Sequence, residues 1–140
     1  MPTATIYTKG LSTNTRSWSD LDLDFQKHPG TKDIVIKKDV EAVKRSIRNL
    51  IRTNRYEKPF RPDIDGGVTR HLFGLSTAHT KFDISYAVEN CISNYEPRAK
   101  VETVNVTMDL DRNGFYVTVI FHVVNSHEPT QVGIFLDRIR

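Results

Sequence analysis

Apolar residues recur at helical spacing in two long stretches of the chain. The first stretch covers residues 39–53 and opens at Asp39, a residue type that suits the N-cap position of a helix. Its apolar stripe is made of Val40, Val43, Ile47, Leu50 and Ile51. The second stretch opens at Thr80, because Thr80 and Asp83 have the spacing of a capping box. Its stripe is made of Ile84, Ala87, Val88, Cys91, Ile92 and Tyr95. We therefore predict two long amphipathic helices.

A shorter helical segment is expected between the two long helices. Gly66 and Gly67 interrupt the chain, and residues 68–75 then have the spacing of a short helix that buries Val68, Leu72 and Phe73. The second long helix should end before Glu96, because Pro97 disfavours helical backbone in the residue that precedes it.

The last forty residues change to the alternation of β-strands. Apolar residues occupy every second position from Val104 to Leu110 and from Phe115 to Val123. Asn113-Gly114 lies between the two runs and is typical of a two-residue type I′ hairpin turn. That turn would pair Arg112 with Phe115 and set Leu110 opposite Val117.

A third strand, at about Gln131–Arg138, follows the polar loop 125–130. Helices come first and an antiparallel meander comes last, so the predicted fold class is α+β. Two main helices and a short one would pack on the C-terminal antiparallel β-meander, and the two long helices would cover one face of the sheet.

The N-terminal quarter gives a weaker pattern. Leu21, Leu23 and Phe25 alternate with aspartates, which favours a half-buried strand, and residues 28–31 favour a turn before a second strand at 34–36. Residues 1–19 are rich in Thr, Ser and Asn, and we predict a tail that is either mobile or ordered only by partners. The single domain is expected to cover residues 20–140. Trp18, just before it, is expected to pack against this domain.

Composition places the chain among ordinary globular proteins. Its 140 residues are 38% hydrophobic and 26% charged, enough for one domain with one core. No apolar run approaches the roughly 18 residues of a membrane span, so we expect no membrane partner. No secretory leader opens the chain, and the single cysteine, Cys91, fits a reducing compartment and a buried structural role.

Positive charge is concentrated in one part of the sequence. Residues 37–61 contain nine Lys or Arg and three acidic residues, a net +6 against +3 for the whole chain. The pattern is compatible with a solvated helix face or with contact to an acidic protein. A nucleic-acid partner is not expected, because exposed aromatic residues are not interleaved with the basic ones.

The carboxylates give little support for an enzyme. Glycoside hydrolysis needs two carboxyl groups, one of them held protonated. Glu57 and Glu96 are the candidates worth naming, but Lys58 and Arg98 beside them would lower a carboxyl pKa rather than raise it. We therefore predict no catalytic residues.

No cofactor or metal ion is predicted. The five histidines lack the paired spacing of metal ligands, and no glycine-rich phosphate loop is present. His122 is expected to be a half-buried histidine with its hydrogen bonds satisfied.

Two proline-bearing loops carry the most specific pattern in the chain. In order, the residues are Thr53, Pro59-Phe60, Pro62, Leu72-Phe73 and Tyr95-Glu96-Pro97-Arg98. Together they resemble the lysozyme-like baseplate wedge, or sheath-initiator, family of contractile-tailed phages, which also includes a baseplate component of type VI secretion systems. The resemblance spans about residues 20–140. Tyr56 and Asp65 depart from it, since each stands where the family usually has glycine.

The resemblance implies a structural subunit of the baseplate wedge in a contractile phage tail, near the tail tube. It would bind the wedge core and start sheath assembly in the virion, which is assembled in the host bacterial cytoplasm. The implied partners are other wedge proteins and the tail sheath protein, with the tail tube as a further candidate. The main alternative is a peptidoglycan hydrolase of the tail, and a nucleic-acid-binding module is a weaker one.

Two contact sites follow from the family resemblance. The first, toward the wedge core, is Tyr95, Glu96, Pro97 and Arg98, where Pro97 would fix the side chains on either side. The alternative for this loop is a helix terminator whose charges pair within the chain. The second site is an edge strand that would pair with strands of the sheath protein. Its residues are Gln131, Val132, Gly133, Ile134, Phe135 and Leu136.

Overall fold

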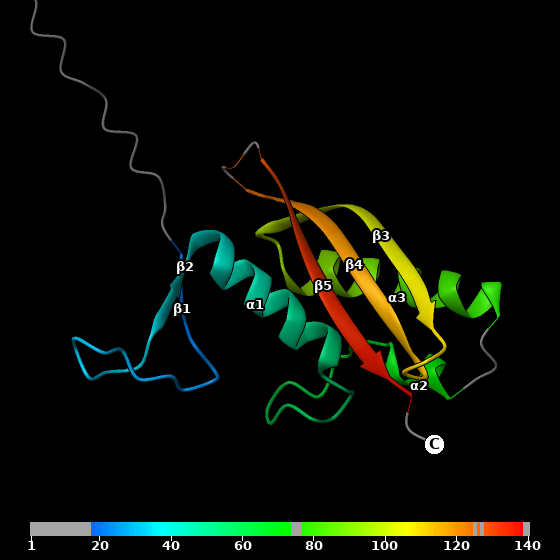
Figure 1. Ribbon diagram of the computed structural model, residues 1–140, viewed down its shortest axis with the longest axis horizontal. Coiled ribbons are helices and arrows are strands. Elements are labelled where there is room, and N and C mark those ends of the chain that lie inside the picture. Colours follow the sequence, from blue (N-terminus) through cyan, green and yellow to red (C-terminus); the bar gives the residue numbers. More distant parts are fainter. Residues whose placement is uncertain (1–17, 74–76, 125, 127, 139–140) are drawn as a thin grey trace, which may run out of the picture.

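The computed structural model describes residues 18–73, 77–124, 126 and 128–138. A three-stranded antiparallel sheet in the order β3-β4-β5 forms one layer of the fold. Two long helices pack on one face of this sheet, as Figure 1 shows, and a short helix lies between them in sequence. The strands are β3 (Ala99–Asp109), β4 (Gly114–Val123) and β5 (Pro129–Asp137), and the helices are α1 (Asp39–Arg52), α2 (Thr69–Leu72) and α3 (Ala78–Tyr95). The predicted α+β class is confirmed.

The core lies between the helices and the sheet. The helical stripes and the alternate strand residues meet there, and their side chains are almost fully buried. Chief among them are Val43, Ile47, Ile51, Ile84, Val88, Ile92, Phe115, Val117, Val119 and Phe121. Burying side chains of this size contributes roughly 1.5–3 kcal/mol each, so the two periodic patterns account for most of the driving force for folding.

Both long helices begin differently from the prediction. Asp39 does not cap α1: the N-cap is Lys38, and the Asp39 carboxylate accepts from the backbone N–H of Trp18 at 3.1 Å. Thr80 is not the cap of α3: the N-cap is Thr77, and the helix starts at Ala78. Thr77 and Thr80 form the capping box instead, each side chain accepting from the other's backbone N–H. Both helix bodies are where the apolar stripes placed them.

The segment before α3 is shorter than predicted. Val68 and Leu72 are buried as expected, but Phe73 is 61% exposed because α2 ends at Leu72. Residues 74–76 of the predicted short helix lie outside the described residues.

The hairpin between β3 and β4 has a longer turn than the sequence predicted. Asp109 pairs with Gly114 and Met108 with Phe115, so residues 110–113 form the connection and the predicted pairing of Arg112 with Phe115 is wrong. The Asp109 carboxylate accepts from the N–H of Arg112 at 3.0 Å, which stabilises this four-residue turn. The shift along β3 is an even number of residues, so apolar side chains still face apolar ones.

Gly114 serves close packing rather than the turn itself. It is Asn113 that has a positive φ, of 50°. A Cβ atom on Gly114 would lie 2.6 Å from a ring carbon of Phe135 and 2.7 Å from the carbonyl oxygen of Leu136. The glycine is therefore needed where β5 passes the start of β4.

The N-terminal quarter forms a short two-stranded arm. β1 (Ser19–Leu21) pairs with β2 (Ile36–Lys38), and the chain between them loops away from the body, as Figure 1 shows. The predicted half-buried face is wrong: Leu21, Leu23 and Phe25 are 58%, 51% and 67% exposed. Asp22 is buried instead, 3.5 Å from the ammonium of Lys37, because β1 ends before the alternation does.

Trp18 packs against the main core, as predicted. Apart from Trp18 and Ser19, the predicted tail of residues 1–19 lies outside the described residues. Within the described ranges, none of the helices has both the length and the apolar character that crossing a bilayer requires.

Candidate partner-binding sites

The Glu96-Pro97-Arg98 loop joins the end of α3 to the start of β3. The Glu96 N–H closes the last turn of α3 on the carbonyl of Ile92 at 2.8 Å, and the N–H of Ala99 donates to the Glu96 carbonyl at 3.1 Å. Pro97 lies inside this tight turn. The loop is therefore fixed at both ends by backbone hydrogen bonds.

The charged side chains of the loop form a compact cluster. The Glu96 side chain points inward and is buried, and Arg98 donates to it in two parallel hydrogen bonds of 2.6 and 2.8 Å. Two further nitrogen–oxygen contacts of 3.2 Å join Arg98 to one carboxylate oxygen of Asp20 on the arm. A planar guanidinium is suited to such paired contacts, which lysine could not reproduce.

The protonation states of this cluster follow from its contacts. Burial raises the pKa of Glu96, but hydrogen bonds from Arg98 and from the Ser46 hydroxyl, with the Arg98 charge, together hold it below its usual range. The hydrogen bond to Glu96 raises the pKa of Arg98. At neutral pH the loop therefore carries a carboxylate and a guanidinium that stabilise each other.

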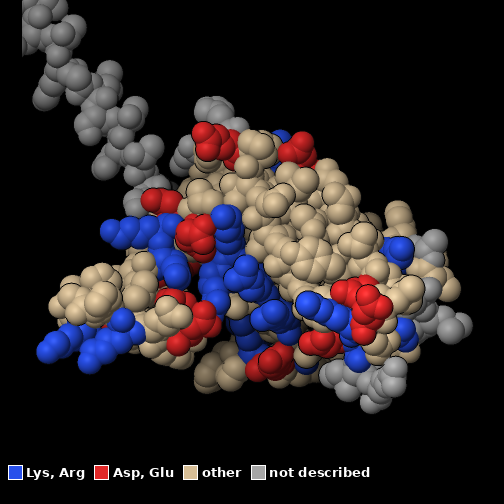
Figure 2. Space-filling model, viewed as in Figure 1, with Lys and Arg blue, Asp and Glu red and all other residues tan. Residues whose placement is uncertain are grey.

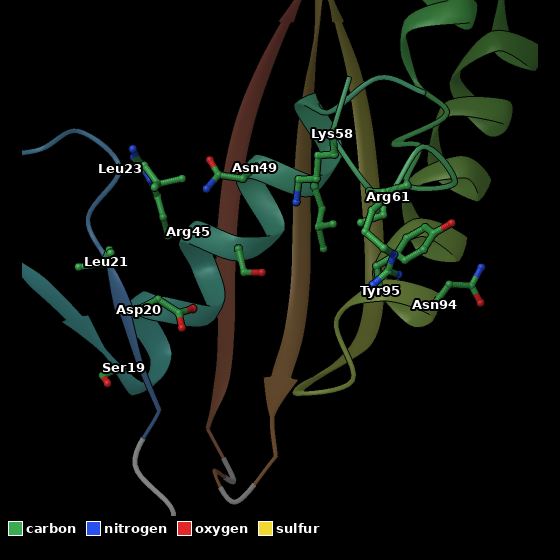
Figure 3. A pocket seen from close by; sticks show the side chains of 13 residues that line it. Ser19, Asp20, Leu21, Leu23, Arg45, Asn49, Lys58, Arg61, Asn94 and Tyr95 are labelled. Atoms are coloured by element: carbon green, nitrogen blue, oxygen red, sulfur yellow. The ribbon is translucent and has the colours of Figure 1, made fainter. Parts of the chain in front are cut away.

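An open cavity of about 580 Å³ lies beside this cluster, between the arm, α1, the loop after α1 and the end of α3. Figure 3 shows side chains from all four segments around it. Tyr95 forms part of its wall, and its hydroxyl donates to the carbonyl of Asp63 at 2.9 Å. Tyr95 thus ties the loop after α1 to the end of α3.

The cavity wall combines apolar and basic side chains. Leu21 and Leu23 of the arm line it and are more than half exposed. Arg45, Lys58 and Arg61 add positive charge on the α1 and loop sides. Arg45 also contacts Asp24 of the arm at 2.5 Å, which holds the arm against α1. A partner segment with apolar and acidic side chains would complement such a surface.

The loop after α1 presents two aromatic residues to solvent. Phe60 is 99% exposed and Tyr56 is 74% exposed, and each has a φ of 66°, the left-handed region that favours glycine. Tyr56 is where the resembling family usually has glycine, and its backbone keeps the conformation that a glycine would adopt most readily. Arg55 lies over the Tyr56 ring at 5.3 Å. The expectation that no exposed aromatic residues are interleaved with the basic ones is therefore wrong for this loop.

The second predicted site, β5, is an edge strand of the sheet. In an antiparallel ladder, residue pairs that exchange backbone hydrogen bonds alternate with pairs that do not. Successive N–H groups of β5 therefore point in turn toward β4 and away from it. The N–H of Arg138 donates to the carbonyl of Asn113, just before the start of β4. The amides of residues an even number before Arg138 therefore also face β4. The amides of Gln131, Gly133 and Phe135 therefore point away from β4, toward the open edge.

The two predicted sites are parts of different surfaces. The Glu96-Pro97-Arg98 loop lies where β3 begins, while residues 131–136 run along the opposite edge of the sheet. Sequence reasoning missed Asp20 and Ser46, which complete the charged cluster, and the cavity beside it. Asp20 is 78 residues from Arg98 in the chain, and no local pattern connects the two.

Comparison with known proteins places this geometry in a family. The family model of the baseplate wedge protein gp25 matches residues 37–128, which is more than half of the chain. The chain belongs to the gp25 baseplate wedge family. Membership confirms the predicted family resemblance and a structural role in a tail baseplate.

Individual members and structures agree with this assignment. The baseplate wedge protein gp25 of Enterobacteria phage T4 is 28% identical over 114 residues, which cover 81% of this chain and 86% of that protein. A chain in the baseplate of the anti-feeding prophage has the same fold, with a TM-score of 0.69, 24% identity and coverage of 80% of this chain and 90% of that chain. A protein of Geobacter sulfurreducens, provisionally named a tail lysozyme, superposes with a TM-score of 0.67 at 20% identity, over 71% of this chain and 91% of that chain.

The two candidate hydrolase carboxylates of this chain lie in settings that do not suit a catalytic acid. Glu96 is buried against Arg98 and keeps its charge, whereas a catalytic acid must hold a proton. Glu57 is exposed and accepts from the N–H of Asn54 at 2.7 Å, closing a local turn.

In the described part of the chain, no group of three or more His, Cys, Asp or Glu could hold a metal ion. Burial raises the pKa of the Cys91 thiol to about 11, in keeping with the predicted structural role.

Proposed function

We propose that this protein is a wedge subunit of a contractile phage tail baseplate, which binds the wedge core beside Glu96-Pro97-Arg98 and starts sheath assembly through β5. The observation that supports this most is the match to the gp25 baseplate wedge family over residues 37–128. Its site of action is the baseplate of the virion, and assembly takes place in the host bacterial cytoplasm.

The wedge-core contact uses the charged loop and the cavity next to it. Glu96 and Asp20 fix the guanidinium of Arg98, whose side chain is still 22% exposed, so its direction is set before a partner arrives. Such preorganisation lowers the entropy lost on binding. Tyr95 and Pro97 shape the surface around it, and the exposed leucines of the arm add apolar area on the other side of the cavity.

A pair of matched substitutions tests this contact. Leu23→Ser removes an exposed apolar side chain at the cavity, and Phe82→Ser removes one on α3 that does not line it. Both side chains are exposed, so stability should change by no more than about 0.5 kcal/mol. We expect Leu23→Ser to reduce co-purification with the wedge complex at least severalfold and Phe82→Ser to leave it unchanged. If both variants are incorporated into the wedge complex equally well, the cavity is not part of the wedge-core contact.

The sheath contact uses the open edge of β5. An added strand would form backbone hydrogen bonds with the outward amides of Gln131, Gly133 and Phe135, which are the groups that an edge strand offers. The baseplate would thus begin the sheath by continuing its own sheet into the first sheath subunits. We also expect the tail tube to be a neighbour of this subunit in the baseplate.

We propose no enzymatic role. A turnover assay on purified peptidoglycan, with Glu57→Gln and Glu96→Gln as controls, tests this directly. Turnover that either substitution abolishes would contradict a purely structural function.

A further inference from the structure

The two edges of the sheet differ in how they are protected. β3 carries Lys100 and Glu102, has a bulge between Val101 and Thr103, and has the carbonyl of Val104 occupied by the Ser85 hydroxyl of α3 at 3.2 Å. Charges, bulges and covering elements are the usual means of preventing an edge strand from pairing with another chain. β5 pairs with β4 in unbroken register and has no charged side chain before Asp137. The unprotected edge is therefore β5.

A row of basic side chains runs along α1 next to this edge. Lys44, Arg48 and Arg52 are spaced four residues apart, so they follow one ridge of the helix. Lys44 pairs with Glu41 at 2.8 Å. In the described ranges, Arg48 and Arg52 form no ion pair within 4 Å of an acidic residue, although the charge of Arg48 helps to lower the pKa of Asp24 on the arm. Figure 2 shows Lys and Arg gathered in a band over α1, bordered by an uncharged surface over the strands.

Helix α1 and strand β5 run side by side in the same direction, as Figure 1 shows. Arg52, at the end of α1, lines one cavity together with Phe135, Leu136 and Asp137, at the end of β5. A strand added to the open edge of β5 would therefore have one of its two faces directed toward the basic ridge of α1.

The spacing of the ridge matches the repeat of such a strand. Residues four apart on a helix are separated by about 6 Å along the axis. Alternate residues of a strand, which share one face, are separated by about 6.6–6.8 Å. Three basic residues at i, i+4 and i+8 of α1 can therefore each meet one side chain at positions j, j+2 and j+4 of a neighbouring strand.

We propose that β5 and the ridge of Lys44, Arg48 and Arg52 form one docking strip for an extended protein segment with acidic side chains at alternate positions. The backbone of the segment pairs with β5, and its carboxylates face α1. The inference rests on the proposed use of β5 as a pairing edge, and it adds the charge pattern that the incoming strand must have. β5 supplies hydrogen bonds that any sequence can form, so the ridge supplies the selectivity.

Synthetic peptides test the strip on the full-length protein. The probe is a nine-residue peptide in which Glu alternates with Val, and the matched peptide has Gln in place of Glu. Binding is measured by fluorescence anisotropy at low and high salt, and pairing with β5 by amide chemical shifts of Gly133 and Phe135. We expect the Glu peptide to bind roughly five to ten times more tightly at low salt, with most of this preference lost at high salt.

Variants that remove positive charge show which residues cause the preference for the Glu peptide. Arg48→Gln with Arg52→Gln leaves only Lys44 of the ridge and should remove most of the preference for the Glu peptide. Lys58→Gln with Arg61→Gln removes the same charge from the loop side of α1 and should keep the preference. Equal affinity of both peptides for the unaltered protein, with shifted β5 amides, would overturn the strip but leave β5 pairing intact.

Two other outcomes separate the proposals further. If neither peptide shifts the β5 amides at millimolar concentration, both the strip and the proposed pairing edge are wrong. If a single-stranded oligonucleotide competes with the Glu peptide without shifting those amides, the ridge is a general polyanion site and the strip is overturned.

Discussion

The Glu96-Pro97-Arg98 loop and the β5 edge were both predicted as contact sites, and the structure leaves them in opposite states. The loop has satisfied its charges within the chain: Glu96 is buried, and Arg98 contacts both Glu96 and Asp20. The open edge of β5 has amides at alternate positions with no strand of the described chain opposite them. One region is internally complete, and the other has its pairing capacity unused.

This difference separates two ways in which a sequence motif can serve assembly. A closed cluster fixes the shape of a surface, and its loss should be visible in the isolated protein. An open edge contributes little to the isolated protein, and its loss should be visible only when a partner strand is present. Stability and assembly therefore become separate measurements for the two regions.

The largest effect on stability is expected from Arg98→Ala. The change leaves the carboxylate of Glu96 buried without its main partner and also frees Asp20. Removing one member of a buried ion pair costs about 3 kcal/mol or more, which would lower the melting temperature by roughly 10 °C. Thermal unfolding of the purified protein measures it.

Arg98→Lys separates the effect of charge from that of geometry, because lysine keeps the positive charge but loses the planar guanidinium. We expect it to recover less than half of the lost stability. Unchanged melting of both variants would show that the cluster does not brace the fold and that its role is confined to partners.

The fold was predictable wherever a local repeat decided it. The stripes of α1 and α3 and the alternation of β4 each bury one face, and a repeat of this kind survives small errors in the ends of an element. The hairpin turn was not predictable from Asn113-Gly114. Asp109 stabilises a longer turn, and Gly114 is required for the approach of β5, which is distant in sequence.

The candidate site was predictable only in part, for a similar reason. Glu96, Pro97 and Arg98 are adjacent, so the sequence displayed them together. Asp20 joins them only because the arm folds back along α1. In the arm, alternation suggested that Leu23 was buried and Asp22 exposed. β1 ends at Leu21, before that alternation is complete, and the buried residue is Asp22, beside Lys37.

A smaller effect is expected from acid. The folded-state pKa of Glu96 is lowered, so its contribution to stability is complete above the unfolded-state pKa of about 4.3 and is lost as pH falls through the folded-state value. The difference in melting temperature between the unaltered protein and Glu96→Gln should therefore be largest above about pH 5 and shrink below it. Melting curves from pH 7 to pH 3 provide the test, and a difference that stayed constant with pH would mean that the charge of Glu96 is not what stabilises the loop.

The smallest effect on stability is expected at the open edge, from Gln131→Pro. Its amide points away from β4, so proline removes an outward donor without breaking the ladder, and stability should change by less than about 1 kcal/mol. Sheath growth on baseplates carrying this variant should nevertheless be strongly reduced. Gln131→Ala keeps the amide and serves as the control, whereas Ile134→Pro is unsuitable because its amide faces β4 and its loss would unfold the sheet. If the sheath grows normally on baseplates that carry folded Gln131→Pro, the open edge of β5 is not where the sheath begins. The Glu96-Pro97-Arg98 loop and the β5 edge would then differ only in how much each contributes to stability.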